Sequence, residues 1–172
     1  MFIMAGPSGP PGLHDNWTLW FHDPKDESWK ESSYRHVLNI ENVDEWTTTH
    51  IAFKEMWIQG MFWIMRKGIL PIWEDPANAR GGCFSFKIMK PEVADAWFRL
   101  CSLMLGESLV NANKRKTIWN QVTGMAITPK RNYCVLRIWI ADSAHKDIGQ
   151  FTIPVPSYTT VLYKPHQDKI VV

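Results

Sequence analysis

Alternating hydrophobic and polar residues predict β-strands along much of the chain. In the stretch 16–23, Trp17, Leu19 and Phe21 share one face of a strand, while Thr18 lies on the other. The same alternation predicts further strands at 61–65, 82–89, 123–129, 132–142 and 160–165. A short basic turn joins the third and fourth of these stretches, which are therefore expected to pair as an antiparallel hairpin.

Apolar residues spaced three and four apart predict a long helix that begins at Pro91. Proline fits the first helical position and Gly106 fits the end. The residues of its apolar face are Val93, Trp97, Leu100 and Met104. A shorter helix is expected at 42–51, where Asn42 can cap the first turn and acidic residues follow it.

Helices and strands do not alternate regularly, which predicts an α+β fold with a mainly antiparallel sheet rather than βαβ units. At 172 residues the chain is long enough for one domain with a proper core. The Gly/Pro-rich residues 1–12 predict a flexible leader, and residues 13–172 are expected to form a single domain.

Composition and charge exclude several classes of protein. The net charge of +2 is too small for binding that depends mainly on many phosphate contacts, so any nucleic-acid contact should be local. The three cysteines fit neither a CxxC metal site nor a disulfide framework, which favours reduced thiols and a cytoplasmic location. No run of eighteen apolar residues indicates a membrane span.

Ten tryptophans stand out, and three of them are poorly explained by core packing. Trp139 shares a strand face with Arg137, which argues against the deep core. Trp29 stands alone among charged and hydroxyl side chains. Trp73 and Glu74 lie in an irregular loop between a proline and a Gly-Gly pair. We expect these three indoles to lie near the surface.

Exposed indoles beside a carboxylate suit a flat, cationic ligand. Stacking of a nucleobase on an aromatic ring is worth ~1–3 kcal/mol, and a positive charge adds a cation–π attraction. Guanine presents two parallel hydrogen-bond donors, N1–H and the N2 amino group, and the two oxygens of a carboxylate such as Glu74 can accept from both. Trp73 with Glu74 therefore predicts binding of 7-methylguanosine, and the turn residues Lys130 and Arg131 would suit its phosphates.

Six segments in order resemble the cap-binding translation initiation factor 4E family, over roughly residues 13–172. They are "NWTLWF", "SWKES", "VDEW", "IWEDPANARGG", "WFRLCSLMLGES" and "RIWIAD". The resemblance implies a curved antiparallel sheet with helices on its convex side and a cap slot on its concave side. It also implies a compact, divergent member that binds capped mRNA, 7-methyl-GTP and cap analogues without a cofactor or a metal.

The resemblance assigns roles to particular residues. Trp29 and Trp73 would sandwich the methylated guanine, Glu74 would accept from its edge, and Trp139 would approach the N7 methyl group. The positions that would contact phosphate depart most from the family, because Cys83 stands in place of a family arginine and Val135 in place of a family lysine. The remaining cations that could contact phosphate are Lys130, Arg131 and Arg137.

A second surface follows from the same resemblance. An amphipathic helix of a scaffold initiation factor of the 4G type, or of a 4E-binding protein, would dock away from the slot. The expected contact residues are Val43, Trp46, Phe98, Arg99 and Ser102. Arg99 and Ser102 depart from the family's usual acid and leucine. These changes predict weak binding to the ordinary scaffold peptide.

Three functional hypotheses can be weighed from the sequence. The first is recruitment of capped mRNA for translation initiation through a scaffold, and the second is a cap-binding repressor that does not support initiation. The third, a cap-cleaving hydrolase, needs metal-binding carboxylates or a histidine triad, and the six histidines are scattered. We therefore expect no catalytic residues and no enzymatic activity.

Overall fold

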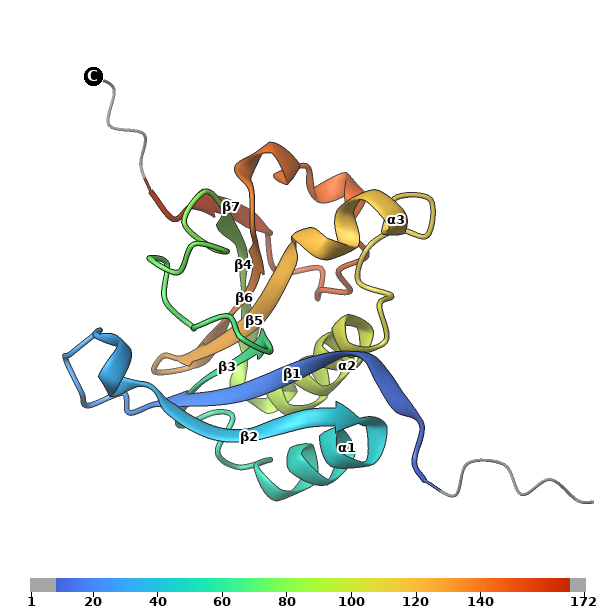
Figure 1. Ribbon diagram of the computed structural model, residues 1–172. Helices are drawn as coiled ribbons and strands as arrows, with labels where there is room; N and C mark the ends of the chain where they lie inside the picture. The colour runs from blue at the N-terminus through green and yellow to red at the C-terminus, as the bar shows by residue number, and fades with distance from the viewer. Residues whose placement is uncertain (1–8, 168–172) are drawn as a thin grey trace, which may run out of the picture.

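The computed structural model describes residues 9–167 and forms a seven-stranded sheet with helices packed on one face (Figure 1). The strands are β1 (Gly12–His22), β2 (Arg35–Asn42), β3 (Met61–Arg66), β4 (Gly82–Met89), β5 (Val122–Pro129), β6 (Tyr133–Ile140) and β7 (Leu162–Pro165). Their order is β2-β1-β3-β5-β6-β4-β7, and every pairing is antiparallel. The predicted α+β class with an antiparallel sheet is confirmed.

Three α-helices accompany the sheet: α1 (Val43–Ala52), α2 (Val93–Leu105) and the short α3 (Arg115–Ile118). Asn42 caps α1 as predicted, since its side chain accepts from the backbone N–H of Glu45 at 2.9 Å. Pro91 lies in a 3₁₀ turn, Lys90–Glu92, and α2 proper begins two residues later than expected. Gly106 ends α2 as predicted.

Strand β2 and helix α3 were not predicted. In β2, Ile40 is fully buried, whereas Val37 and Leu38 are half-buried, because β2 is an edge strand paired on one side by β1. This half-exposed pattern gives a weak alternation signal. Part of the predicted leader, 1–8, lies outside the described residues, and β1 already begins at Gly12.

The main core lies between the convex face of the sheet and helices α1 and α2. The apolar face predicted for α2 is confirmed, with all four residues fully buried. The apolar face predicted for β6 is confirmed in the same way, since Cys134, Leu136, Ile138 and Ile140 are fully buried. A smaller cluster packs on the opposite, concave face around Trp63, Met65, Cys83, Ala126 and Trp139.

The Gly-Gly pair is required by the close approach of neighbouring strands. A Cβ atom on Gly81 would lie 1.7 Å from the carbonyl oxygen of Ile140, and one on Gly82 would lie 2.4 Å from that of Lys164. Any side chain here would push β4 away from β6 and β7. These glycines therefore fix the point at which the loop that carries Trp73 rejoins the sheet.

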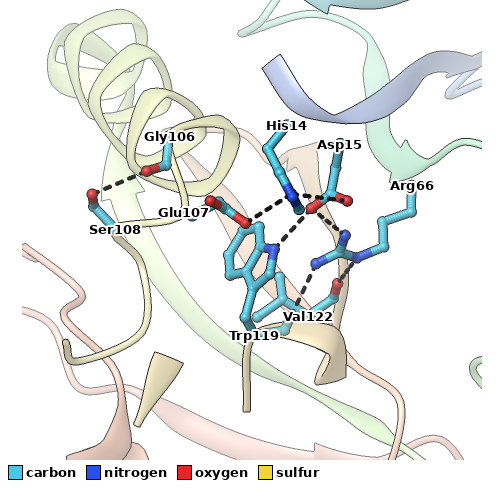
Figure 2. Close-up of polar contacts among 8 residues, drawn as sticks. All are labelled: His14, Asp15, Arg66, Gly106, Glu107, Ser108, Trp119 and Val122. Carbon is cyan, nitrogen blue, oxygen red and sulfur yellow. Dashed lines mark hydrogen bonds and ion pairs between the residues drawn. The ribbon is translucent and has the colours of Figure 1, made fainter. Parts of the chain in front are cut away.

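Arg66 is the centre of a polar cluster that ties β1 and β3 to the segment before β5 (Figure 2). Its Nη1 lies 2.6 Å from Asp15 Oδ2, and its other nitrogens donate to the carbonyl oxygens of Val122 and Trp119 at 2.6 and 2.9 Å. The Trp119 Nε1–H donates to the same Asp15 oxygen at 2.8 Å. The guanidinium also lies 4.9 and 4.7 Å from the ring centroids of Trp17 and Trp119.

The same cluster contains the one group of potential metal ligands found in residues 9–167. His14, Asp15 and Glu107 place ligand atoms within 4.8 Å of one another, and His14 Nδ1 lies 3.2 Å from Glu107 Oε1 (Figure 2). The central carboxylate, Asp15, is already paired with Arg66. A cation here would have to displace that ion pair, so the geometry favours a structural clamp over a metal site.

Candidate functional site

The residues predicted to hold the base gather around one cavity of about 590 Å³ on the concave side of the sheet. It is lined by Trp29, Tyr34, Met61, Trp63, Pro71, Ile72, Trp73, Glu74, Thr128, Lys130, Arg137 and Trp139, and is called the slot below. Two loops rise beside it, residues 23–34 in blue and 67–81 in green (Figure 1). Arg131, an expected phosphate contact, is exposed and does not line the slot.

The two loop indoles are exposed as expected, and the third is not. Trp29 and Trp73 keep 55% and 45% of their surface accessible, although both are large apolar side chains. Trp139 is only 8% exposed, because it packs in the concave-face cluster with Trp63 and under His166, 4.4 Å away between ring centroids. The prediction that Trp139 lies near the surface is therefore wrong, because the side chain is buried. Its ring still lines the floor of the slot.

Side-chain hydrogen bonds fix the loop that carries Trp73. The Asp75 carboxylate accepts from the backbone N–H groups of Leu70 and Ala77, both at 2.8 Å. The fully buried Asn78 donates from Nδ2 to the carbonyl oxygens of Leu70 and Ile72 at 3.0 and 2.9 Å. Glu74, which precedes this network, is left exposed with its carboxylate at the slot.

His22 supports the other loop indole. The rings of His22 and Trp29 are stacked, with centroids 4.5 Å apart and planes within 5° of parallel. His22 Nε2 lies 2.7 Å from the carbonyl oxygen of Ser28, which can only accept, so Nε2 carries the hydrogen. His22 itself is fully buried at the end of β1. One face of the Trp29 ring is therefore held by the sheet.

The floor of the slot is formed by residues that sequence reasoning did not identify. Tyr34, at the end of the 23–34 loop, and Met61 and Trp63 of β3 line the slot as well. Burial raises the pKa of Tyr34 to about 12, and the nearby Glu74 charge adds to the rise, so the phenol stays protonated at neutral pH. Met61 and Trp63 belong to the continuous apolar run of β3, so local alternation could not assign them to the concave face.

Cations collect at one side of the slot. Lys130 and Arg137 line it, and Arg137 Nη1 donates to Thr128 Oγ1 at 2.9 Å. Lys164 on β7 pairs in register with Cys83, the position where the resemblance implies a family arginine. Burial raises the pKa of the Cys83 thiol, while the charges of Arg137 and Lys164 oppose the rise. Lys164, not predicted from sequence, therefore lies near the position that lost its cation.

His166 covers Trp139 without adding charge. Burial lowers its pKa to about 4, so the imidazole is neutral at physiological pH. Its backbone N–H donates to the carbonyl oxygen of Gly81 at 3.0 Å, which links the segment after β7 to the start of β4. A neutral ring thus packs against the Trp139 indole.

The predicted partner surface needs a correction at Trp46. Its indole was expected to be exposed, but it is 2% exposed and its Nε1–H donates to Ser102 Oγ at 2.9 Å. Phe98 stacks on it, with ring centroids 5.8 Å apart and planes 12° from parallel. Val43 is 46% exposed and Arg99 is exposed, as expected. Ser102 thus accepts the hydrogen bond of the Trp46 indole N–H within the chain.

Comparison with known proteins identifies the family. Residues 12–171 match the family model described as "Eukaryotic initiation factor 4E". The chain belongs to the eukaryotic initiation factor 4E family. The family is one of initiation factors rather than enzymes, and none of the helices described between residues 9 and 167 has the length and apolarity needed to cross a bilayer.

Relatives in fungi align over most of the chain. The eukaryotic translation initiation factor 4E of Eremothecium gossypii is 30% identical over 135 residues, which cover 74% of this chain and 61% of that protein. The Candida albicans protein is 26% identical over 152 residues, with coverage of 80% and 69%. The chain thus spans about three fifths to two thirds of the length of these family members.

Solved structures share the fold. A complex of Ascaris suum eIF4E-3 with an m7G cap superposes with a TM-score of 0.75 at 18% identity, covering 95% of this chain and 96% of that one. A complex of C. elegans eIF4E-3 with the 4E-binding protein Mextli and a cap analog gives 0.75 at 16% identity, covering 90% and 92%. These values establish that this 4E-family chain has the fold seen in those complexes.

Proposed function

We propose that this 4E-family chain binds the 7-methylguanosine cap of mRNA in the slot and recruits the mRNA for translation initiation. The observation that carries the proposal is the convergence of two exposed loop indoles, Trp29 and Trp73, with the Glu74 carboxylate on one cavity. Solvent-exposed indoles gain little by themselves, but a flat cationic base covers them and adds stacking and cation–π attraction. The family and the cap complexes of fold neighbours support the same ligand.

In this proposal each wall and the floor has a separate task. Trp29 and Trp73 stack on the two faces of the methylated guanine. Glu74 accepts from the N1–H and the N2 amino group, and Trp139 contacts the N7 methyl group. A guanine without the methyl group is uncharged, so it loses the cation–π attraction and binds more weakly.

The triphosphate would leave the slot on its cationic side. Lys130 and Arg137 line this side, and Lys164 approaches it from β7. The lysine at 164 compensates for the missing arginine at Cys83. Arg131 remains a weaker candidate, because it lies outside the slot and could reach only the more distant phosphates.

Titration of tryptophan fluorescence with 7-methyl-GTP and with GTP tests the proposal. We expect strong quenching and clearly tighter binding for the methylated nucleotide. Glu74→Gln should weaken binding of both nucleotides, because an amide presents a donor where guanine also donates. Equal affinity for the two nucleotides in the unaltered protein would contradict the proposed ligand.

The partner would dock on the convex side, away from the slot. A hollow of about 510 Å³ there is lined by Phe98, Arg99 and Ser102 with neighbouring residues of α2, and Val43 is exposed at the start of α1. An amphipathic helix of a 4G-type scaffold or a 4E-binding protein is the proposed occupant. Since Trp46 is buried, we expect Val43 and Phe98 to supply the apolar contacts.

The occupied Trp46 N–H is the observation that favours the second candidate, a cap-binding repressor. A scaffold helix that needs a free indole donor would find it bonded to Ser102. Pull-down on immobilised 7-methyl-GTP distinguishes the two, since an initiation factor should bring a scaffold subunit with it. Val43→Arg should abolish capture of the scaffold while the protein is still retained on the cap resin. Loss of both together would show that Val43 is needed for folding rather than for partner binding.

A further inference from the structure

The hollow on the convex side of the sheet carries two opposite charges one helical turn apart. It is lined by Asp95, Phe98, Arg99, Ser102, Leu103 and Ser108, and is called the convex hollow below. Asp95 and Arg99 are both exposed on α2, and their four-residue spacing places them on the same face of the helix. Phe98 and Leu103 are half-buried beside them. The convex hollow therefore combines apolar surface with an acidic and a basic side chain.

Neither charge has an ion-pair partner in the described part of the chain. The ion pairs found between residues 9 and 167 include neither Asp95 nor Arg99, although opposite charges at this spacing can pair with each other. Burial lowers the pKa of His50 on α1, Lys54 lowers it further, and the nearby Asp95 charge opposes the drop without reversing it. His50 is therefore neutral at physiological pH and does not compensate the Asp95 carboxylate.

Between the two charges, the convex hollow offers a partner mainly aromatic surface. Phe98 stacks on the Trp46 indole, with planes 12° from parallel. The Trp46 Nε1–H already donates to Ser102. A helix that docks here finds no free indole donor, so the strongest polar groups left to it are the Asp95 carboxylate and the Arg99 guanidinium.

We propose that the convex hollow selects an amphipathic helix whose apolar stripe is bordered by one basic and one acidic side chain, one turn apart. The base would pair with Asp95 and the acid with Arg99, while apolar side chains of the helix cover Phe98 and Leu103. This inference rests on the partner docking proposed above and adds the charge pattern that the partner must carry. A helix with two bases or two acids at these positions would meet one like charge, so the hollow disfavours it.

Two exposed ion pairs select between partners more than they hold them. One exposed pair usually changes affinity by about two- to fivefold, and a like-charge pair opposes binding by a similar factor. Reversal of one charge on the helix should therefore weaken binding about tenfold. The apolar contacts with Phe98 and Leu103 provide most of the binding for matched and mismatched helices alike.

Selection from a peptide library tests the charge pattern. The library presents amphipathic helices of about 16 residues with a fixed apolar stripe. Two positions that border the stripe, one turn apart, carry Lys or Glu at random. The full chain is the bait, and the enriched helices are sequenced. The unaltered protein should enrich helices with one Lys and one Glu.

Charge exchange in the protein should change the composition of the enriched helices. Arg99→Glu should enrich helices with two Lys, and Asp95→Lys should enrich helices with two Glu. The double exchange should restore one Lys and one Glu, whichever way the helix docks. A helix enriched by the unaltered protein should bind Arg99→Glu about tenfold more weakly, and replacement of its Glu by Lys should recover most of the loss.

Controls separate this inference from the proposed function. Lys116→Glu changes an exposed lysine of α3, outside the convex hollow, and should leave the enriched composition unchanged. Urea unfolding should give every variant a midpoint close to that of the unaltered chain, because the exchanged side chains are exposed.

The outcomes that contradict the two proposals differ. The same enriched composition from the unaltered protein, Arg99→Glu and Asp95→Lys would overturn the charge pattern and leave helix docking standing. Capture of no helix by the unaltered protein would overturn the docking of a helix and this inference with it. Cap binding is tested separately by the fluorescence titration with 7-methyl-GTP.

Discussion

The loop that carries Trp73 is fixed by its own side chains, whereas the loop that carries Trp29 is fixed at one point by a strand. Asp75 and Asn78 together make four hydrogen bonds to backbone groups of the Trp73 loop. The Trp29 loop has short-range turns, in which Asp23 and Asp26 each accept from a backbone N–H two residues later. Its link to the sheet is the contact with His22.

This difference indicates how the two walls of the slot are held before a ligand arrives. The Trp73 wall is preorganised by a buried amide whose bonding partners lie within the same loop. The Trp29 wall depends on the stack with one imidazole and one hydrogen bond to Ser28. We expect the Trp73 wall to resist small perturbations and to fail completely when its network is cut. The support of the Trp29 wall should instead decrease gradually, in proportion to how much of the His22 contact is lost.

Cutting the Trp73 network should give the largest effect. Asn78→Ala leaves the carbonyl oxygens of Leu70 and Ile72 without their donors in a buried place, which should cost about 2–3 kcal/mol of folding stability. Affinity for 7-methyl-GTP should fall more than tenfold, because Trp73 and Glu74 lose their support. Urea unfolding and fluorescence titration measure the two quantities. Asn113→Ala, at an exposed asparagine, should change neither; a stable, fully binding Asn78→Ala protein would refute the preorganised wall.

Removal of either indole should weaken binding without unfolding the protein. Trp73→Ala and Trp29→Ala should each cost ~1–3 kcal/mol of stacking with 7-methyl-GTP, plus part of the cation–π attraction. Their unfolding midpoints should stay close to that of the unaltered chain, since both rings are about half exposed. Isothermal titration provides the affinities. Near-normal affinity in Trp73→Ala would remove this residue from the slot.

Loss of the His22 contact should have a smaller effect, and one that acts through Trp29. His22→Ala removes the ring behind Trp29 and should lower 7-methyl-GTP affinity by about 1 kcal/mol, in the range of a single aromatic contact. His22→Phe keeps the ring and should recover most of this affinity. In a Trp29→Ala background, His22→Ala should cause almost no further loss. Additive losses in this double-mutant cycle would show that His22 acts on the slot by another route.

The cations beside the slot should give the smallest effects and should not distinguish the two walls. Lys130→Ala and Lys164→Ala should each cost about 0.5 kcal/mol of 7-methyl-GTP affinity at low salt, and less at high salt. The same loss should occur in Trp29→Ala and Trp73→Ala backgrounds, because neither lysine is on the walls' loops. Affinity measured at two salt concentrations provides the check. If Lys164→Ala has no effect at low salt, the phosphates pass elsewhere.

Strand alternation was enough to predict most of the sheet, because one face of β3 and β6 is fully buried and most of one face of β1 is buried as well. It failed for β2, an edge strand in which Ile40 is fully buried but Val37 and Leu38 are only half-buried. The exposed indoles were predictable, because Trp29 has no apolar neighbours in sequence and Trp73 lies in an irregular loop between a proline and a Gly-Gly pair. Trp46 was not, since its cover comes from Phe98 and Ser102, more than fifty residues away.

Residues brought to the slot by strand register could not be read from the sequence. Lys164 lies beside Cys83 on the sheet because β7 pairs with β4 at this position, and no local pattern specifies this pairing. Trp63 belongs to a strand in which almost every residue is buried, so its face was ambiguous. His22 supports Trp29 across six intervening residues of irregular loop. In each case the position depends on long-range pairing rather than on local propensity.

The clamp around Arg66 has a consequence for behaviour in acid. Burial alone would raise the pKa of Asp15, but hydrogen bonds from Trp119 and Arg66 and the charges of Arg66 and His14 outweigh it, so its pKa lies below the ordinary value. A carboxyl group with a lowered folded-state pKa stabilises the fold above its unfolded pKa of about 4. That stabilisation is lost as pH falls through the folded-state value. Acidification should therefore release the start of β1 from β3 and the segment before β5, and Asp15→Asn should lack this part of the acid sensitivity.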